Sequence, residues 1–284
     1  MSRSERIPLS YFPGCSMATT AKENNRSLIE FCERIGYDLI EVPDWNCCGS
    51  SSAHSVDAEL AQDLATRNLA LAPEGRPLLA ACPNCMLRLR GAQRHLAEDL
   101  DAQKRCEARW GRPVDPNLKL IHFFDLLAGA DMKGLNKTSP GLKGMKFVPY
   151  YGCMLARPPA MRHEPNHHGL MEKILSDLGA EPRRWGYGAR CCGTFLSVVR
   201  PDVVGTMVDA IFRNAAAAGA DCLVTACAMC HMNLEVRSTL QNRIPVLHFS
   251  EALALATGKG EDRDWFSRHL VDPRPMLRSA RLIG

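Results

Sequence analysis

Ten of the thirteen cysteines in this 284-residue chain form two copies of one pattern. In the first copy, a single Cys15 is followed after 31 residues by Cys47-Cys48-Gly49 and after 33 more by Cys82-Pro-Asn-Cys85. In the second copy, Cys153 is followed after 37 residues by Cys191-Cys192-Gly193 and after 34 more by Cys227-Ala-Met-Cys230. Matched positions are offset by 138, 144 and 145 residues. We interpret this regularity as an internal duplication.

Five cysteines in each copy indicate metal chemistry. Soft thiolate ligands select iron–sulfur clusters or zinc. A structural zinc ion takes four ligands, so five is one too many. Adjacent cysteines on a strand also point apart, which suits different metal atoms of a multinuclear cluster better than one tetrahedral ion. Gly49 and Gly193 would then let the backbone approach the inorganic core without a Cβ clash. A zinc-dependent scaffold stays open, and it predicts a colourless protein with stoichiometric zinc.

The other three cysteines have no counterpart in the other copy. We interpret Cys32, Cys106 and Cys222 as buried small hydrophobic residues. A disulfide framework is disfavoured, because it is typical of small secreted domains and this chain shows no secretion signal.

Composition fits a globular protein of one large or two smaller domains, with 46% hydrophobic and 23% charged residues. No run approaches eighteen apolar residues, so we expect no membrane span and a cytoplasmic location. The net charge of +4, with basic residues scattered among acidic ones, does not indicate a nucleic-acid partner. Neither a GxGxxG fingerprint nor a P-loop is found, so electrons must come from another protein of the same complex.

Short apolar runs alternate with helical stretches in both copies, which predicts an α/β fold with parallel sheets covered by helices. We expect strands at Ile7–Phe12, Leu39–Val42, Leu78–Ala81, Lys146–Tyr151, Arg183–Trp185 and Cys222–Thr225. We expect helices at Thr20–Ile35, Val56–Leu71, Leu170–Leu178 and Pro201–Ala218. Each copy ends with a strand, a His and a helix start, at Leu120–Leu127 and Val246–Leu253.

Two modules, 1–140 and 141–258, follow from this repeat, joined by the glycine-containing stretch 129–144. The charged tail, 259–284, is either a docking arm or loose. Cys15, Cys82, Cys153 and Cys227 each come directly after a strand, at the edge where open parallel sheets keep their sites. The CxxC pairs run into helices, whose N-termini favour negatively charged sulfur.

The doubled array resembles the cysteine-rich CCG domain of the heterodisulfide reductase B subunit. The matching stretches include Tyr150–Pro159, Cys191-Cys-Gly-Thr-Phe-Leu-Ser197 and Cys227-Ala-Met-Cys-His-Met-Asn233. The resemblance extends from about Leu9 to Gly258, with slightly shorter gaps before the CxxC pairs than is usual in that family.

This resemblance implies two pseudo-symmetric CCG modules, each with a non-cubane 4Fe–4S cluster at the carboxyl ends of the strands. Carried over position by position, the ligands are Cys15, Cys47, Cys48, Cys82 and Cys85, then Cys153, Cys191, Cys192, Cys227 and Cys230. The resemblance also implies two partners, one similar to the C subunit of that reductase, with cubane 4Fe–4S clusters, and one similar to its A subunit, a flavoprotein. The substrate would be a disulfide, a thiol or a lipoyl-bound sulfur.

Opening a disulfide takes two electrons, which two one-electron clusters facing one cavity supply. His231 is a candidate proton donor to a product thiolate, or else a cap or a hydrogen-bond donor to cluster sulfide. Arg157 is a candidate to hold an anionic substrate group, or else to offset cluster charge. The rival interpretation is an electron-transfer subunit without its own substrate chemistry, as in unusual succinate dehydrogenases. A cavity between the clusters lined by Arg157 and His231 would favour catalysis, and continuous protein there would favour a relay.

Overall fold

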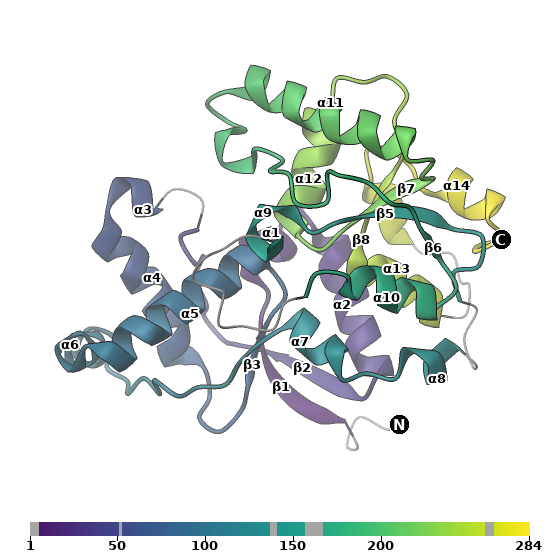
Figure 1. Ribbon diagram of the computed structural model, residues 1–284. Coiled ribbons are helices and arrows are strands. Elements are labelled where there is room, and N and C mark those ends of the chain that lie inside the picture. The colour runs from purple at the N-terminus through teal and green to yellow at the C-terminus, as the bar shows by residue number, and fades with distance from the viewer. Residues whose placement is uncertain (1–5, 51–52, 137–140, 157–166, 259–263) are drawn as a thin grey trace.

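Two four-stranded parallel sheets form the centre of the computed structural model, which describes residues 6–50, 53–136, 141–156, 167–258 and 264–284. The strand orders are β2-β1-β3-β4 and β6-β5-β7-β8. The second order repeats the first with each label raised by four, so the predicted α/β duplication is confirmed (Figure 1).

The described elements of the first half are, in chain order, β1 (Ile7–Phe12), α1 (Gly14–Ala18), α2 (Lys22–Arg34), β2 (Tyr37–Glu41), α3 (Ala53–Val56), α4 (Ala58–Leu71), β3 (Leu78–Ala80), α5 (Pro83–Glu98), α6 (Leu100–Trp110), β4 (Leu120–His122), α7 (Phe123–Ala128) and α8 (Met132–Asn136).

The described elements of the second half are β5 (Lys146–Tyr150), α9 (Gly152–Ala156), α10 (Leu170–Asp177), β6 (Glu181–Pro182), η3 (Thr194–Leu196), α11 (Pro201–Ala217), β7 (Cys222–Thr225), α12 (Ala228–Arg237), β8 (Val246–His248), α13 (Phe249–Thr257), η4 (Asp264–Arg268) and α14 (Arg274–Ser279).

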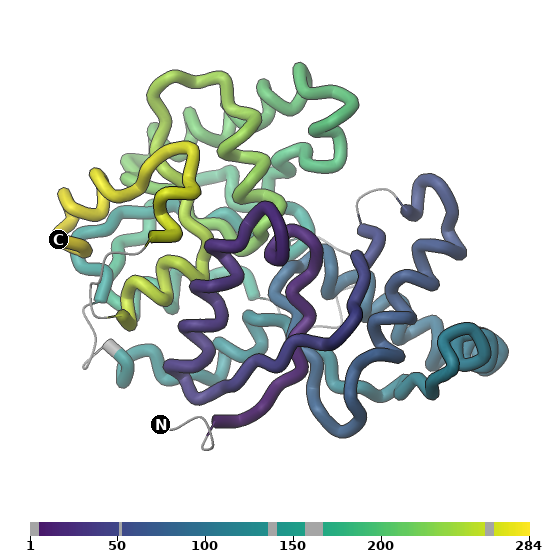
Figure 2. The backbone as a smooth tube through the Cα atoms, turned by 180° about the vertical axis from the view of Figure 1, so that it is seen from behind, coloured from purple at the N-terminus to yellow at the C-terminus, as the bar shows by residue number. Residues whose placement is uncertain are grey.

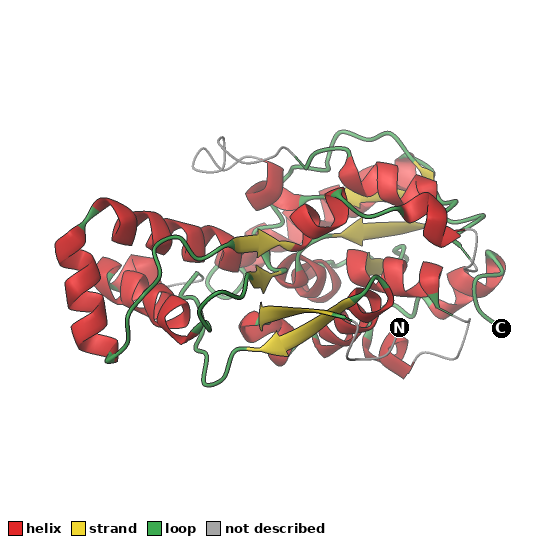
Figure 3. Ribbon diagram, turned by 90° about the horizontal axis from the view of Figure 1, so that it is seen from below, coloured by secondary structure: helices red, strands yellow, loops and turns green. Residues whose placement is uncertain are grey.

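The central strands are short and almost wholly apolar, because helices cover both faces of each sheet (Figure 3). β3 and β7 are buried at every position. They hold equivalent places in their sheets: Leu78 pairs with Ser10 and Leu120, and Leu223 pairs with Val148 and Val246.

Matched capping boxes set the helices that follow the last strand of each half. His122 and Asp125 cap the start of α7, and His248 and Glu251 cap the start of α13. In both boxes the His side chain accepts a backbone N–H and the acidic side chain accepts the N–H of the His. The repeated strand, His and helix start seen in the sequence are thereby confirmed.

Two predicted elements differ from the structure. The helix expected at Val56–Leu71 is divided into α3 and α4, because Asp57 between them is extended and its carboxylate caps α4 through the N–H groups of Glu59 and Leu60. The strand expected at Arg183–Trp185 lies two residues earlier, as the two-residue edge strand β6. Pro182 lacks an N–H, so it is tolerated at such an edge.

The two halves share one hydrophobic core. α2 from the first half lies along α13 from the second (Figure 2), where Ser27 Oγ and Ser250 Oγ hydrogen-bond at 2.7 Å. Phe31, Phe147 and Phe249 belong to the same buried cluster. Because this core crosses the proposed module boundary, the division at residue 140 stays a prediction.

The C-terminal segment, residues 264–284, packs into this core and is neither a loose tail nor a docking arm. Trp265, Phe266, Leu277 and Leu282 are buried in the shared cluster. Their apolar side chains were obscured in the sequence by the charged residues around them. Among the residues that the structure describes, no helix combines the length and apolar character needed to cross a bilayer.

We expect Phe266→Ala to lower the free energy of unfolding by about 3–5 kcal/mol, because it removes a fully buried ring. Leu270→Ala is the matched control, since Leu270 is 63% exposed four residues later and should change stability by less than about 0.5 kcal/mol. Chemical denaturation measures both. Equal, small effects would show that the C-terminal segment is not packed as described.

Candidate metal centres

The ten patterned cysteines lie in loops and helix starts that follow strands, and Cys15, Cys82, Cys153 and Cys227 come after β1, β3, β5 and β7, as the sequence predicts. Cys15 and Cys153 lie in the short helices α1 and α9 that follow β1 and β5. The CxxC pairs begin α5 and α12, with Cys82 and Cys227 at the N-cap positions. The adjacent pairs occupy the loops after the edge strands β2 and β6.

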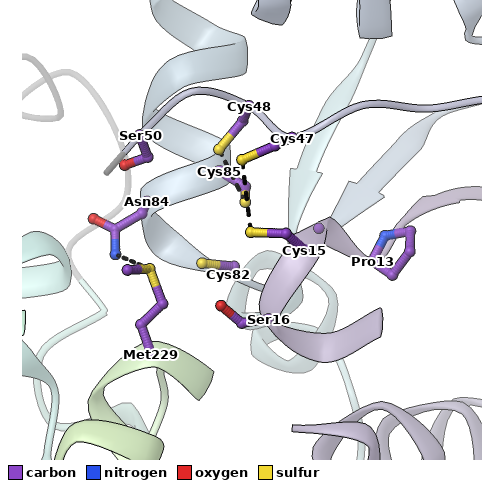
Figure 4. Close-up of a pocket in the computed structure, with 11 residues that line it drawn as sticks. Pro13, Cys15, Ser16, Cys47, Cys48, Ser50, Cys82, Asn84, Cys85 and Met229 are labelled. Carbon is purple, nitrogen blue, oxygen red and sulfur yellow. Dashed lines mark hydrogen bonds between the residues drawn. The ribbon is translucent and has the colours of Figure 1, made fainter. Parts of the chain in front are cut away.

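The five cysteines of the first copy line one cavity (Figure 4). The Cys47 Sγ lies 3.6 Å from the Cys15 Sγ, and the Cys48 Sγ lies 3.3 Å from the Cys85 Sγ. Ser16, Ser50, Asn84 and Met229 also line this cavity. The prediction that these five residues converge is therefore confirmed.

The second copy repeats this geometry. The Cys192 Sγ lies 3.5 Å from the Cys230 Sγ, and the thiols of Cys153 and Cys191 hydrogen-bond to each other. The backbone N–H of Gly193 donates to the Cys191 Sγ at 3.3 Å. Each copy thus places its single cysteine beside the first member of its adjacent pair, and the second member beside the last cysteine of its CxxC.

Each group has an outer and an inner side. The outer thiols are exposed or half-buried: Cys15, Cys47, Cys153 and Cys191. The inner thiols are buried: Cys48, Cys82, Cys85, Cys192, Cys227 and Cys230. All thirteen cysteines carry free thiols, so disulfides do not explain this clustering. The unpatterned Cys32, Cys106 and Cys222 are buried among apolar residues, as expected.

The inner sides of the two groups meet. The thiols of Cys82 and Cys227, which occupy matched positions in the repeat, interact with each other. Asn84 bridges the same junction, with its Nδ2 3.9 Å from the Cys227 Sγ and 3.6 Å from the Met229 Sδ. The inner thiols of the two groups are therefore in contact across the boundary between the halves.

Proton sharing among the thiols favours thiolate in each group. The hydrogen bond with Cys153 lowers the pKa of Cys191 to about 6, while the same contact raises the pKa of Cys153. The hydrogen bond with Cys15 likewise lowers the pKa of Cys47, to about 2. The contact with Cys227 lowers the pKa of Cys82, and the N–H groups of Cys85 and Asn84 at the start of α5 act in the same direction. Thiolate is the form that binds metal.

The glycine that precedes the single cysteine of each copy, Gly14 or Gly152, lets the backbone lie close to a cysteine sulfur. A Cβ on Gly14 would lie 2.9 Å from the Cys85 Sγ, and one on Gly152 would lie 3.3 Å from the Cys230 Sγ. Both residues also have positive φ. Their role was missed from the sequence, although the repeated Gly-Cys at 14–15 and 152–153 was the signal for it.

The glycines that follow the adjacent pairs have a different reason from the one expected. A Cβ on Gly49 would lie 3.1 Å from the side chains of Ala53 and Leu64, and one on Gly193 would lie 3.0 Å from Val204. Both have positive φ, +73° and +79°. Here the missing Cβ therefore makes room for neighbouring side chains, chiefly of α4 and α11, and permits a left-handed turn.

The donor set fits a multinuclear iron–sulfur centre. Each group offers five converging thiols, three of them withdrawn from water, and a backbone that comes as close to sulfur as glycine allows. Thiolates are the ligands that such clusters take from proteins.

The structure describes one of the two other candidate residues, His231. His231 is buried on α12, where its Nδ1 faces the Asn24 Oδ1 at 3.1 Å and its ring lies 4.9 Å from that of His269. In the described part of the chain no hydrogen bond joins its side chain to a cysteine sulfur, and its role as a proton donor stays a prediction. Arg157 lies outside the described residues.

A cysteine-rich domain family matches this chain twice, over residues 9–90 and 147–235. The two matches contain the two cysteine groups just described, together with most residues of β1–β3 and β5–β7. The chain therefore belongs to the family defined by the CCG cysteine-rich domain, and it carries that domain in duplicate.

Curated relatives place the whole chain beside components of reductases. It is 29% identical over 261 residues to the 8-methylmenaquinol:fumarate reductase membrane anchor subunit of Wolinella succinogenes, covering 87% of this chain and 91% of the relative. It is 25% identical over 274 residues to the B subunit of the ferredoxin/F420H2-dependent CoB-CoM heterodisulfide reductase of Methanosarcina acetivorans, covering 89% and 90%. The resemblance to the heterodisulfide reductase B subunit is thereby confirmed.

A solved structure shares the fold. The crystal structure of a hypothetical protein from Helicobacter pylori superimposes with a TM-score of 0.73 at 12% identity, over 93% of this chain and 51% of that one.

We expect alkylation of Cys191 in reduced, metal-free protein to proceed at a nearly constant rate between pH 7 and 9, since a pKa of about 6 leaves the thiol ionised throughout. Cys153, whose pKa is raised, should react faster as the pH rises. Mass spectrometry of the labelled peptides measures both rates. A Cys191 rate that climbs about tenfold per pH unit would contradict the proton sharing described here.

Proposed function

We propose that this chain is the iron–sulfur subunit of a heterodisulfide reductase-like complex. In this proposal the ten cysteines hold two non-cubane 4Fe–4S clusters, and the protein interconverts a disulfide or lipoyl-bound sulfur with thiols. The observation that carries the proposal is the contact between the thiols of Cys82 and Cys227, which brings the two five-thiol groups together. A disulfide needs two electrons, and a cluster in each group would supply one.

The chain's own residues divide the work between the two sides of each group. The inner cysteines are withdrawn from water and keep the groups in contact, while one exposed and one half-buried cysteine at each outer side leave sulfur accessible. In the first group, Ser16 and Ser50 line the cavity together with the thiols, which gives a substrate sulfur polar neighbours at the cysteines. A bound iron–sulfur cluster would add one-electron redox chemistry to this frame.

Exposed apolar side chains beside the adjacent cysteine pairs support docking of an electron-delivering partner. Val56 is 81% exposed just after the first pair, and Val198 is 86% exposed just after the second, with Phe195, Leu196 and Val199 around it. Large apolar side chains gathered in this way are characteristic of interaction surfaces. We propose that a cubane-cluster protein similar to the reductase's C subunit binds here, and that a flavoprotein similar to its A subunit supplies that partner with electrons.

A second candidate is an electron relay without substrate chemistry. Asn84 and Met229 fill the junction between the inner sides of the groups, so protein rather than a substrate occupies that place. The outer sides would then be the two docking points, with electrons passing through both groups. The relationship to a component of an 8-methylmenaquinol:fumarate reductase agrees with this alternative.

Iron and sulfide counts with electron paramagnetic resonance on anaerobically purified protein test the proposal. We expect two clusters per chain, whose spectra change when a disulfide or a lipoyl ligand is added. Two clusters that ignore these ligands but exchange electrons with a partner would establish the relay. Stoichiometric zinc at the cysteines in a colourless protein would overturn both candidates.

We expect Cys82→Ser to abolish one cluster and to alter the spectrum of the other, because Cys82 belongs to the first group and contacts the second through Cys227. Cys106→Ser is the matched control, since Cys106 is buried on α6 and belongs to neither group. Iron content and paramagnetic resonance measure the outcome. If Cys82→Ser retained both signals unchanged, Cys82 would not be a ligand.

We expect Gly14→Ala to lose the iron of the first group and to keep that of the second, since the new Cβ would press on the Cys85 sulfur. Gly75→Ala separates this effect from backbone strain, because Gly75 has a similar φ of +68° with nothing within 4 Å of its Cβ position. Both variants should lose about 1 kcal/mol of stability. Equal iron contents in the two variants would remove the sulfur-packing role of Gly14.

A further inference from the structure

Two histidines and two glutamates form a buried cluster in the second half, outside the cysteine groups. His231 and Glu235 lie on α12, Glu251 lies in the first turn of α13, and His269 directly follows η4. All four residues are more than nine-tenths buried. One nitrogen of each His and one carboxylate oxygen of Glu251 lie within 4.8 Å of one another.

Hydrogen bonds hold both rings next to Glu251. The His231 Nδ1 faces the Asn24 Oδ1, an acceptor, so this nitrogen carries the proton and the Nε2 keeps its lone pair. That Nε2 has no hydrogen-bond partner among the described residues. The His269 Nδ1 faces the Glu235 Oε1 at 3.4 Å, and its Nε2 faces the Glu251 Oε1 at 2.8 Å. Because a carboxylate only accepts, the His269 Nε2 carries a proton here, and a bound metal ion would take the place of that proton between the ring and Glu251. The Glu235 carboxylate lies on the outer side of the same ring, a common position for a carboxylate beside a metal-binding His.

The cluster also carries an excess of negative charge. Glu23, Glu235 and Glu251 are buried together, and His269 is the one ring among them that their charge would keep protonated. Burial, followed by the charge of Glu251, raises the pKa of Glu23 to about 7. Uncompensated charge inside a protein is costly, so this cluster calls for a cation.

In the first half, an arginine neutralises the carboxylate at the position that matches Glu251. Asp125 matches Glu251 in the repeated capping box, and Arg90 matches Glu235 at the offset of 145 residues. The Arg90 Nη2 contacts the Asp125 Oδ2 at 3.1 Å. In the second half the arginine is replaced by a glutamate, and His231 stands where the first half has Met86. The second half thus has a carboxylate and an imidazole, both possible metal ligands, where the first half has a guanidinium and a thioether.

We propose that the Nε2 atoms of His231 and His269 and the carboxylate of Glu251 bind a divalent transition-metal ion of the zinc type. Imidazole and carboxylate ligands suit zinc, which is commonly held by three protein ligands with a water molecule as the fourth. Asn24 and Glu235 orient the two rings. The Glu251 Oε2 accepts the His248 N–H at 2.7 Å, which fixes that carboxylate in place.

The ion would tie three separate parts of the chain together. α12 begins with Cys227 and contains Cys230, α13 lies in the shared core, and His269 belongs to the C-terminal segment. Binding would therefore hold the C-terminal segment against the helix that presents two cysteines of the second group. The site is independent of the proposed redox function, because it uses no cysteine.

Zinc per chain in the full-length protein tests this site. After chelation and re-addition of zinc, we expect one tightly held ion in the wild type and in Cys82→Ser and Cys230→Ser. We expect Glu251→Gln and His269→Gln to lose it. Glu235→Gln should weaken affinity about 10- to 100-fold, as the loss of an orienting partner does. Asp125→Asn, the matched change in the first half, should leave the affinity unaltered.

Cobalt substitution of the wild type keeps the test decisive if a variant fails to fold. Cobalt at this site should give weak visible bands without the strong near-ultraviolet absorption of cobalt bound to thiolate. Zinc that disappears only with the cysteine variants would overturn the proposal. So would full zinc retention in both Glu251→Gln and His269→Gln. A wild type that binds neither metal would show that protonated His269 alone neutralises the cluster, and this too would overturn it. Zinc held by the cysteines would be lost in the cysteine variants and kept in Glu251→Gln and His269→Gln, so this site and the redox proposal are judged separately.

Discussion

The close packing of the cysteine sulfurs explains how the other elements of this molecule are arranged. Thiols held 3.3–3.6 Å apart share protons, and neighbouring thiolates repel one another unless a cation lies between them. Left in solution, such sulfurs would oxidise to disulfides. The fold makes them converge by fixing them in the loops and helix starts that follow the strands, and it withdraws six of them from water.

The duplicated fold packs the sulfurs in the same way in both halves and brings the two groups into contact. The two sheets have equivalent strand orders, and equivalent glycines press on equivalent cysteines. Packing of α2 against α13 makes one core of the two halves, which brings Cys82 and Cys227 into contact. The copies have also diverged, as the change from Arg90 to Glu235 shows. In the first half, Arg90 neutralises the capping carboxylate of Asp125. In the second half, His231 and His269 lie around the capping carboxylate of Glu251 instead.

Regular patterns made much of this architecture predictable. β1 and β7 lie where their apolar runs indicated, and cysteine spacing identified both groups before their geometry was known. The split between α3 and α4 was missed because it depends on one extended residue, Asp57. The burial of Phe266 and the His231 cluster were missed for another reason. Both depend on contacts between segments distant in sequence, which local periodicity does not record.

Iron K-edge X-ray absorption on anaerobically prepared protein tests the central claim most directly. If the two thiol groups each hold a multinuclear iron–sulfide core, the first shell should contain sulfur alone, with iron–iron scattering beyond it. A first shell of nitrogen and oxygen, isolated iron atoms without iron neighbours, or a protein that binds no iron would contradict that claim.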